Sequence, residues 1–221
     1  MVLLPVWNKL FGLKQRFPET WKWVEYSNQI QGWLTEAEAD QLFKLSRSFV
    51  AEDRGVVVEL GSWKGKSSVM LAAGLLGKRN ACLYCIDPFG RDENADYQEK
   101  YYDKLLDQGG DIEKIFELNM TTCGVDRVVK ALKGYSFEVI EGWAQPIDVL
   151  FIDTNHEYDA VLRDFTQWSV HVKRGGIVAF HDATEGWPGA LRVVNEKLKP
   201  PEFNSPVRVD SLVWSIKQFH T

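Results

Sequence analysis

The chain has 221 residues, of which 45% are hydrophobic and 26% are charged. This length supports one substantial hydrophobic core and does not require two, so we expect a single domain. The formal net charge is -5 and no block of Lys and Arg occurs. A general nucleic-acid binder needs a basic face to neutralise phosphates, so we expect a small-molecule partner and no nucleic acid.

The composition indicates neither a disulfide framework nor a membrane protein. Three cysteines, an odd number, fit a reducing compartment. Cys82 and Cys85 have the spacing of a redox or zinc pair, but they fall in an apolar run typical of a strand, where side chains three residues apart point to opposite faces. No stretch approaches the roughly 20 apolar residues of a membrane span, and the first residues lack the basic region of a secretory signal. We expect a cytoplasmic protein.

Residues 1–33 are rich in aromatic side chains and lack a clear period, which predicts an arm preceding a domain at 34–221. Large aromatics need burial, so we expect the arm to cover the substrate side of a pocket or to contact a second subunit of a homo-oligomer. Packing against the arm's own domain is an equal alternative. The domain then begins with a helix, because Thr35 and Glu38 form a capping box before apolar residues at helical spacing.

Buried strands alternate with amphipathic helices from residue 55 onward, which is typical of a doubly wound, mostly parallel α/β sheet. The predicted strands are 56–60, 81–86, 128–132, 147–152 and 176–180. Four predicted helices are 66–76, 97–108, 111–120 and 189–198. A fifth predicted helix has an apolar face from Val161 to Val172 and ends at Gly175. Two closing segments, 207–209 and 212–217, leave no room for a crossover helix, so they pair antiparallel if they are adjacent.

A glycine-containing loop, residues 59–67, follows the first predicted strand. Gly61 and Gly65 permit a tight turn and a close approach of a ligand to the next helix. The loop is one residue too short for a nucleoside triphosphate loop, and Trp63 obstructs the pyrophosphate of a dinucleotide. The carboxylate of Glu59 would repel phosphate but suits the cationic cofactor S-adenosylmethionine (SAM). A purely structural turn is the alternative.

The segment VVVELGSWKGKSS resembles the first motif of class I SAM-dependent methyltransferases. The resemblance covers about residues 30–218 and includes NQIQGWL, FIDTNHEYDAVLRDF and GGIVAFHDA. These segments are most like a bacterial branch that includes O-methyltransferases of antibiotic and sugar tailoring. The resemblance implies a Rossmann-like three-layer sandwich, with a seven-stranded sheet in the order 3-2-1-4-5-7-6 and an antiparallel hairpin at the end.

The resemblance also implies where the cofactor lies. Asp87, after the second strand, can accept both ribose hydroxyl protons, with a turn aspartate before Pro88 as the alternative. Ser136 falls in the segment that lines the adenine in relatives, and Trp143 is a weaker candidate for the same wall, where a core role is the alternative. The expected cofactor-binding residues are Glu59, Gly61, Ser62, Gly65, Ser67, Asp87, Ser136 and Asp153.

Two acids and two histidines follow neighbouring strands, Asp153 and His156 after the fourth and His181 and Asp182 after the fifth. We call these four residues the His–Asp cluster. Each alone would more often cap a helix, but together they can hold a cation or take a proton. In metal-dependent relatives an aspartate and an acidic or amide pair hold magnesium. Asp153 and Asp182 match that pattern, whereas His181 and Asn155 depart from it.

Two mechanisms therefore stay open. A divalent cation such as magnesium is held by Asp153, His181 and Asp182, or a metal-free reaction uses His156 or His181 as the catalytic base. The family branch implies a small hydroxylated acceptor such as a sugar. The alternatives are a non-catalytic SAM-binding protein and, less favoured, a nicotinamide-dependent oxidoreductase.

Overall fold

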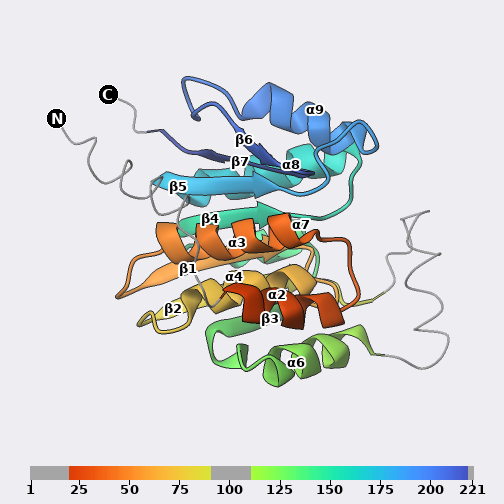
Figure 1. Ribbon diagram of the computed structural model, residues 1–221. Coiled ribbons are helices and arrows are strands. Elements are labelled where there is room, and N and C mark those ends of the chain that lie inside the picture. Colours follow the sequence, from red (N-terminus) through yellow and green to blue (C-terminus); the bar gives the residue numbers. More distant parts are fainter. Residues whose placement is uncertain (1–19, 91–110, 219–221) are drawn as a thin grey trace.

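The computed structural model describes residues 20–90 and 111–218 (Figure 1). The first 19 residues of the predicted arm and the predicted helix at 97–108 lie outside these ranges. Among the described residues, no helix is both long enough and apolar enough to cross a membrane.

A seven-stranded sheet forms the middle layer, with helices on both faces (Figure 1). The strand order is β3-β2-β1-β4-β5-β7-β6, so the predicted order is confirmed. The strands β1 to β5 run parallel, β7 is antiparallel to β5, and β6 is antiparallel to β7, as predicted for the closing hairpin. The strands are β1 (Gly55–Leu60), β2 (Ala81–Asp87), β3 (Val129–Lys133), β4 (Ile147–Ile152), β5 (Val172–Phe180), β6 (Val207–Val209) and β7 (Leu212–Ile216).

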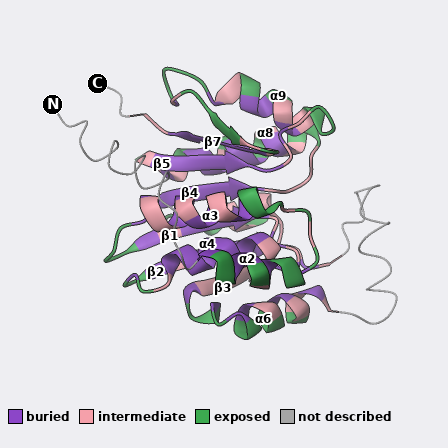
Figure 2. Cartoon of the chain, viewed as in Figure 1, coloured by how far each residue is buried: buried purple, intermediate pink, exposed green. Residues whose placement is uncertain are grey.

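The helices lie in two layers that the strands supply with alternate side chains. Val57 and Val149 face a hydrophobic layer that includes residues of α2, α3, α4 and α6, whereas Val58 and Leu150 face a layer with α8 and α9. Figure 2 shows the central strands as buried, as expected for a sheet covered on both faces. The helices are α2 (Thr20–Gln29), α3 (Glu36–Phe49), α4 (Lys66–Leu75), α6 (Ile112–Thr122), α7 (Ser136–Val139), α8 (Tyr158–Trp168) and α9 (Pro188–Lys197), with 3-10 turns at Asp126–Val128, Ile140–Gly142 and Ser169–His171.

One predicted helix is too long. The prediction that a helix continues to Val172 and ends at Gly175 is wrong, because α8 ends at Trp168 and β5 begins at Val172. Val172 enters the same hydrophobic layer as the apolar face of α8, so its spacing mimics a further helical turn. Gly175 has φ 76° at the irregularity where the register of β5 against β4 shifts, so its conformational freedom serves the strand and not a helix end.

The described part of the predicted arm packs on the domain itself. Helix α2 lies against α3 and α4 (Figure 1). The Ser27 hydroxyl donates to the Lys66 carbonyl at 3.0 Å, and the Lys66 ammonium donates to the carbonyls of Ser27 and Ile30 at 3.2 and 3.3 Å. A role of the arm in a homo-oligomer stays a prediction. The chain then passes through Gly32–Leu34 into α3, where the Thr35 and Glu38 capping box is confirmed.

Candidate active site

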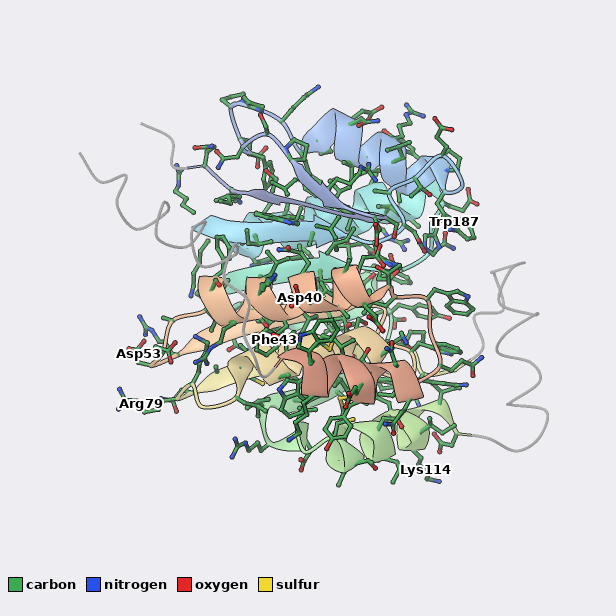
Figure 3. The ribbon with its side chains drawn as sticks, in the orientation of Figure 1. Asp40, Phe43, Asp53, Arg79, Lys114 and Trp187 are labelled. Atoms are coloured by element: carbon green, nitrogen blue, oxygen red, sulfur yellow. The ribbon has the colours of Figure 1, made fainter. Side chains whose placement is uncertain are left out.

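A cavity of about 640 Å³ opens at the carboxyl ends of the parallel strands. It lies where the chain order reverses between β1 and β4, the place at which open α/β sheets bind their ligands. Figure 3 shows Trp187, which lines this cavity, at the end of the molecule opposite to Asp53 and Arg79. Each of the first five strands contributes residues at its carboxyl end or directly after it, namely Gly61–Trp63, Asp87–Pro88, Gly134–Phe137, Asp153–His156 and His181–Asp182.

The loop after β1 is as tight as the sequence predicts. Gly61 and Gly65 have φ of 85° and 89°, a left-handed region that favours glycine. A Cβ atom at Gly61 would lie 2.0 Å from the Asp153 carbonyl oxygen, so the loops after β1 and β4 touch through this glycine. At Gly65, which begins α4, a Cβ would lie 2.4 Å from the Met120 Cε. Gly61 therefore presents backbone without a side chain to the cavity, whereas Gly65 is not among the residues that line it.

Glu59 lies behind the cavity wall and is fully buried. Its carboxylate accepts hydrogen bonds from the Ser67 hydroxyl at 2.6 Å, from the Ser68 hydroxyl and from the Cys85 thiol at 3.4 Å. Burial raises the pKa of Glu59, and the two serine hydroxyls act in the opposite direction. These bonds tie the first turn of α4 to β1. The predicted contact between Glu59 and the cofactor stays a prediction, whereas Ser62 and Ser67 line the cavity.

Asp87, the last residue of β2, lines the cavity and braces two loops. Its Oδ2 accepts from the Trp63 amide at 2.8 Å, and its Oδ1 accepts from the Phe89 amide at 2.7 Å. Burial raises the pKa of Asp87, and these backbone amides oppose the rise. The turn role considered for Asp87 is thus present. Each carboxylate oxygen keeps a second lone pair, so Asp87 can still accept a ribose hydroxyl.

Asp164 on α8 is a buried cavity residue that the sequence reasoning missed. It accepts hydrogen bonds from the Ser136 hydroxyl and, at 2.7 Å, from the Thr154 hydroxyl. It thereby joins the loop after β3 to the loop after β4. Burial raises the pKa of Asp164, and the two hydroxyls act against that effect. A carboxylate directly before Phe165 on the apolar face of α8 is the signal that could have revealed it.

Trp143 does not line the cavity. Its ring lies 4.9 Å from the ring of Tyr84 and 5.2 Å from that of Trp168. The cavity lining therefore gives no support to Trp143 as an adenine wall, and its partly buried ring packs against the hydrophobic layer of α8 and α9. Tyr135 and Phe137, whose rings stack 5.2 Å apart, line the cavity on either side of Ser136.

The structure brings the four residues of the His–Asp cluster together at the edge of the cavity. His181 Nδ1 lies 3.3 Å from Asp153 Oδ1 and 3.4 Å from Asp182 Oδ2. His156 Nε2 lies 3.1 Å from Asp182 Oδ2 and 3.9 Å from Asp153 Oδ1. Asp182 has φ 51°, a conformation that aspartate tolerates better than most residues. Neighbouring strand ends thus converge on one group of titratable side chains.

Glu38 joins this group from α3, which the sequence did not predict. Its Oε2 lies 3.3 Å from His181 Nε2, and both side chains are almost fully buried. Its Oε1 accepts from the Ser211 amide and hydroxyl at 2.8 and 2.6 Å and from the Leu212 amide at 3.1 Å. The capping box signals a local role for Glu38, but a contact with His181 depends on tertiary packing.

The three carboxylates decide the charge of His181. Burial alone would lower the pKa of its imidazole, but Asp153, Asp182 and Glu38 outweigh burial and raise the pKa to about 12. Burial would also raise the pKa of Glu38, yet the contacts with His181 and Ser211 lower it to about 2. These carboxylates favour the protonated form of His181. Because a base needs an unprotonated nitrogen, this arrangement favours His156 over His181 as the predicted base.

Donor atoms of Asp153, His181 and Asp182 lie within 4.8 Å of one another, close enough to surround one ion. A histidine nitrogen must be unprotonated to bind a metal. His181 Nδ1 instead faces two carboxylate oxygens, which accept protons and do not donate them when ionised. The predicted metal ligands are therefore adjacent, and a cation among them requires an unprotonated His181 Nδ1. A divalent cation at this site stays a prediction.

Two exposed tryptophans border the cavity. Trp33 is 57% exposed and its ring stacks on Trp63 at 5.2 Å, and Trp187 is 39% exposed and stacks on His156 at 4.3 Å. Large exposed rings that line a pocket are typical of a ligand-binding surface. Trp33 belongs to the predicted arm, so part of that segment borders the cavity as well as the domain.

A family model described as a methyltransferase domain matches residues 58–183, more than half of the chain. The chain belongs to this methyltransferase family. The match begins in β1 and ends just after the His–Asp cluster, so it spans most of the cavity walls described above. The resemblance indicated by the four sequence segments is thereby confirmed.

The other comparisons support the fold of this methyltransferase. An uncharacterised protein of Acanthamoeba polyphaga mimivirus is 28% identical over 160 residues, which are 70% of this chain and 64% of that protein. The match thus spans slightly less than two thirds of the relative's length.

Solved structures extend the comparison over nearly the whole chain. Cofactor-bound Rv0187 from MTB has a TM-score of 0.66 at 13% identity and covers 93% of this chain and 92% of its own. The O-methyltransferase TomG from Streptomyces achromogenes, in complex with SAM, has a TM-score of 0.62 at 14% identity. The match covers 93% of this chain and 92% of TomG. A Bacillus cereus O-methyltransferase in complex with SAH has a TM-score of 0.60 at 13% identity, and the match covers 92% of this chain and 93% of that enzyme. At these identities the likeness concerns the fold.

Proposed function

We propose that this methyltransferase binds SAM across the carboxyl edge of the sheet and transfers its methyl group to a hydroxyl of a small molecule. The observation that carries the proposal is a single cavity that holds both the glycine turn with Asp87 and the His–Asp cluster. The SAM and SAH complexes of TomG and the Bacillus cereus enzyme support the choice of cofactor.

The part of the cavity near β2 and β3 suits the adenosyl group. Asp87 would accept the ribose hydroxyls, while the Ser136 segment and the stacked rings of Tyr135 and Phe137 would border the adenine. The backbone at Gly61 lets the amino-acid end of SAM approach β1. The sulfonium would then lie between β1 and β4, beside Asp153.

His156 is the proposed base. The acceptor oxygen attacks the methyl carbon in line with the sulfur, the carbon–sulfur bond breaks, and its electron pair stays on the sulfur of SAH. His156 takes the hydroxyl proton. Asp182 Oδ2, 3.1 Å from His156 Nε2, orients the imidazole and stabilises the charged form that results. The proposal routes no step through a divalent cation, which the adjacent Asp153, His181 and Asp182 could hold.

The acceptor is proposed to be a small hydroxylated ring compound such as a sugar. Trp33 and Trp187 offer rigid apolar faces at the border of the cavity, on which one face of a ring can pack. The acceptor hydroxyl would reach His156, whose ring stacks on Trp187.

Thermal denaturation with SAH or NADH separates the candidate cofactors. Stabilisation by a ligand that binds only the folded chain is RT ln(1 + [L]/Kd), about 2.7 kcal/mol at a hundredfold excess over Kd. We expect SAH to raise the melting temperature and NADH to leave it unchanged. Turnover of methyl-labelled SAM with a panel of hydroxylated acceptors then separates an enzyme from a non-catalytic SAM-binding protein. A shift with NADH alone, or binding of SAH without turnover on any acceptor, would contradict the proposal.

A further inference from the structure

Ser136, Thr154 and Asp164 meet in one wall of the cavity, although they come from α7, the loop after β4 and α8. The side chain of Asp164 lies in a residue that is only 1% exposed. Its Oδ1 accepts from the Ser136 hydroxyl, and its Oδ2 accepts from the Thr154 hydroxyl at 2.7 Å. We call these three residues the hydroxyl–acid wall.

The hydrogen bonds of the hydroxyl–acid wall fix where its protons lie. A serine or threonine hydroxyl carries one proton and two lone pairs. Because both hydroxyls donate their proton to Asp164, only their lone pairs remain for a ligand. An ionised carboxylate also only accepts hydrogen bonds. The wall therefore offers acceptors to the cavity, and a ligand group that donates a hydrogen bond fits it best.

The adenosyl group of SAM carries few hydrogen-bond donors. They are the two ribose hydroxyls and the 6-amino group of the adenine, whereas the unsubstituted ring nitrogens are acceptors. The ribose hydroxyls are assigned to Asp87, the last residue of β2. Tyr135 and Phe137, whose rings would border the adenine, flank Ser136 in the chain and line the same cavity. The 6-amino group is thus the donor that remains for the hydroxyl–acid wall.

We propose that Ser136 and Thr154 accept hydrogen bonds from the 6-amino group of the cofactor, and that Asp164 sets this specificity by holding both hydroxyl protons. Asp164 is a positioning residue, because it acts through the two hydroxyls. The inference rests on the proposed function, since it takes SAM as the ligand. It adds the residues that distinguish a 6-amino purine from a purine without that group.

Arg163 offers the competing arrangement. It lines the cavity one position before Asp164, and its guanidinium lies 4.2 Å from the centre of the Phe137 ring. A guanidinium only donates hydrogen bonds, so Arg163 would bind a ring nitrogen of the base and not its amino group. A base bound in this way would lose little affinity if the amino group were removed. The two arrangements therefore differ in how much the 6-amino group contributes.

Calorimetry of the full chain with SAH and with its 6-deamino analogue, in which a hydrogen replaces the amino group, tests the proposal. The two ligands share the ribose, the ring nitrogens and the amino-acid end, so a general loosening of the site affects both. We expect the wild type to bind the analogue about 10- to 100-fold more weakly, because acceptors of the wall are left unpaired. Equal affinities would overturn the proposal and favour Arg163.

The Asp164→Asn variant supplies the second comparison. Its amide donates where the carboxylate accepted, so one hydroxyl proton can turn toward the cavity. We expect the preference for SAH over the analogue to fall at least about fivefold, whereas Asp159→Asn, on the exposed face of α8, should keep it. Ser136→Ala and Thr154→Val are measured separately, in case Asp164→Asn does not fold, and at least one of them should lower the preference.

An undiminished preference for SAH in every folded variant of the hydroxyl–acid wall would overturn the proposal. Absence of SAH binding to the wild type would remove the proposed function and this inference together. Binding of SAH without a preference over the analogue would overturn the inference alone, so the two failures are distinguishable.

Discussion

Glu38 lies 3.3 Å from His181 although 143 positions separate the two residues. The same carboxylate closes the capping box of α3 and accepts from the turn between β6 and β7. One acid thus links the segment that contains Trp33 to the strand end that carries the His–Asp cluster. Its contacts are numerous and buried, so its replacement should have large effects.

Glu38→Gln should destabilise the fold by about 1.5 to 3 kcal/mol, because hydrogen bonds to a charged group are lost and an amide proton replaces an acceptor. Chemical denaturation measures the change. Glu36→Gln on the exposed side of the same turn is the matched control, and we expect it to change stability by less than about 0.5 kcal/mol. Equal effects of the two substitutions would show that the buried network contributes nothing measurable.

Gly61→Ala should be much more disruptive than Gly77→Ala. Both glycines have a left-handed backbone, with φ of 85° and 86°, so both substitutions carry the strain of that region, about 1 to 2 kcal/mol. Only at Gly61 does the added Cβ meet backbone, 2.0 Å from the Asp153 carbonyl oxygen, whereas nothing lies within 4 Å at Gly77. Thermal denaturation of the two variants compares them. If Gly77→Ala is the more destabilised of the two, the close approach of the two loops is not as described.

Asp164→Asn should weaken SAH binding about tenfold, equivalent to about 1.4 kcal/mol. The amide group replaces one of the oxygens that bind the hydroxyls of Ser136 and Thr154, which loosens the loop at the predicted adenine wall. Isothermal calorimetry measures the affinity, with Asp159→Asn on the exposed face of α8 as the control. An unchanged affinity would place the adenine elsewhere in the cavity.

His156→Ala should lower turnover by about 10² to 10⁴ while leaving SAH affinity nearly intact, which is the usual contribution of a general base. His171→Ala, in the 3-10 turn before β5, should leave both quantities unchanged. Steady-state rates on the identified acceptor and calorimetry with SAH supply the comparison. Wild-type turnover by the His156 variant would remove this residue from the mechanism.

Much of the fold could be predicted because it depends on local periodicity and on limits to chain crossing. Two closing strands without a helix between them must pair antiparallel if adjacent, and β6 and β7 do so. The helix was predicted to continue to Val172 because this strand residue enters the hydrophobic layer of α8 at helical spacing. The convergence of Asp153 and Asp182 followed from their places after neighbouring strands.

The missing parts of the site depend on tertiary contacts that sequence spacing does not encode. Glu38 already had a local explanation as a capping residue, and its second role requires α3 to pack across the end of β5. Likewise, His156 and His181 each follow the end of a strand, so the sequence pattern offers both as the base. Only the carboxylates around His181 distinguish a cation from a base.

Calorimetric titration of SAH into the wild type and Asp87→Ala tests the central claim most directly, because Asp87 is the proposed ribose acceptor in the cavity. We expect the wild type to bind one SAH per chain, and Asp87→Ala to bind it more weakly by about 1.5 to 3 kcal/mol, the range for a hydrogen bond to a charged group. Asp53→Ala, at the opposite end of the molecule (Figure 3), should match the wild type. Absence of SAH binding to the wild type at millimolar concentration, or equal affinity of the wild type and Asp87→Ala, would contradict the account.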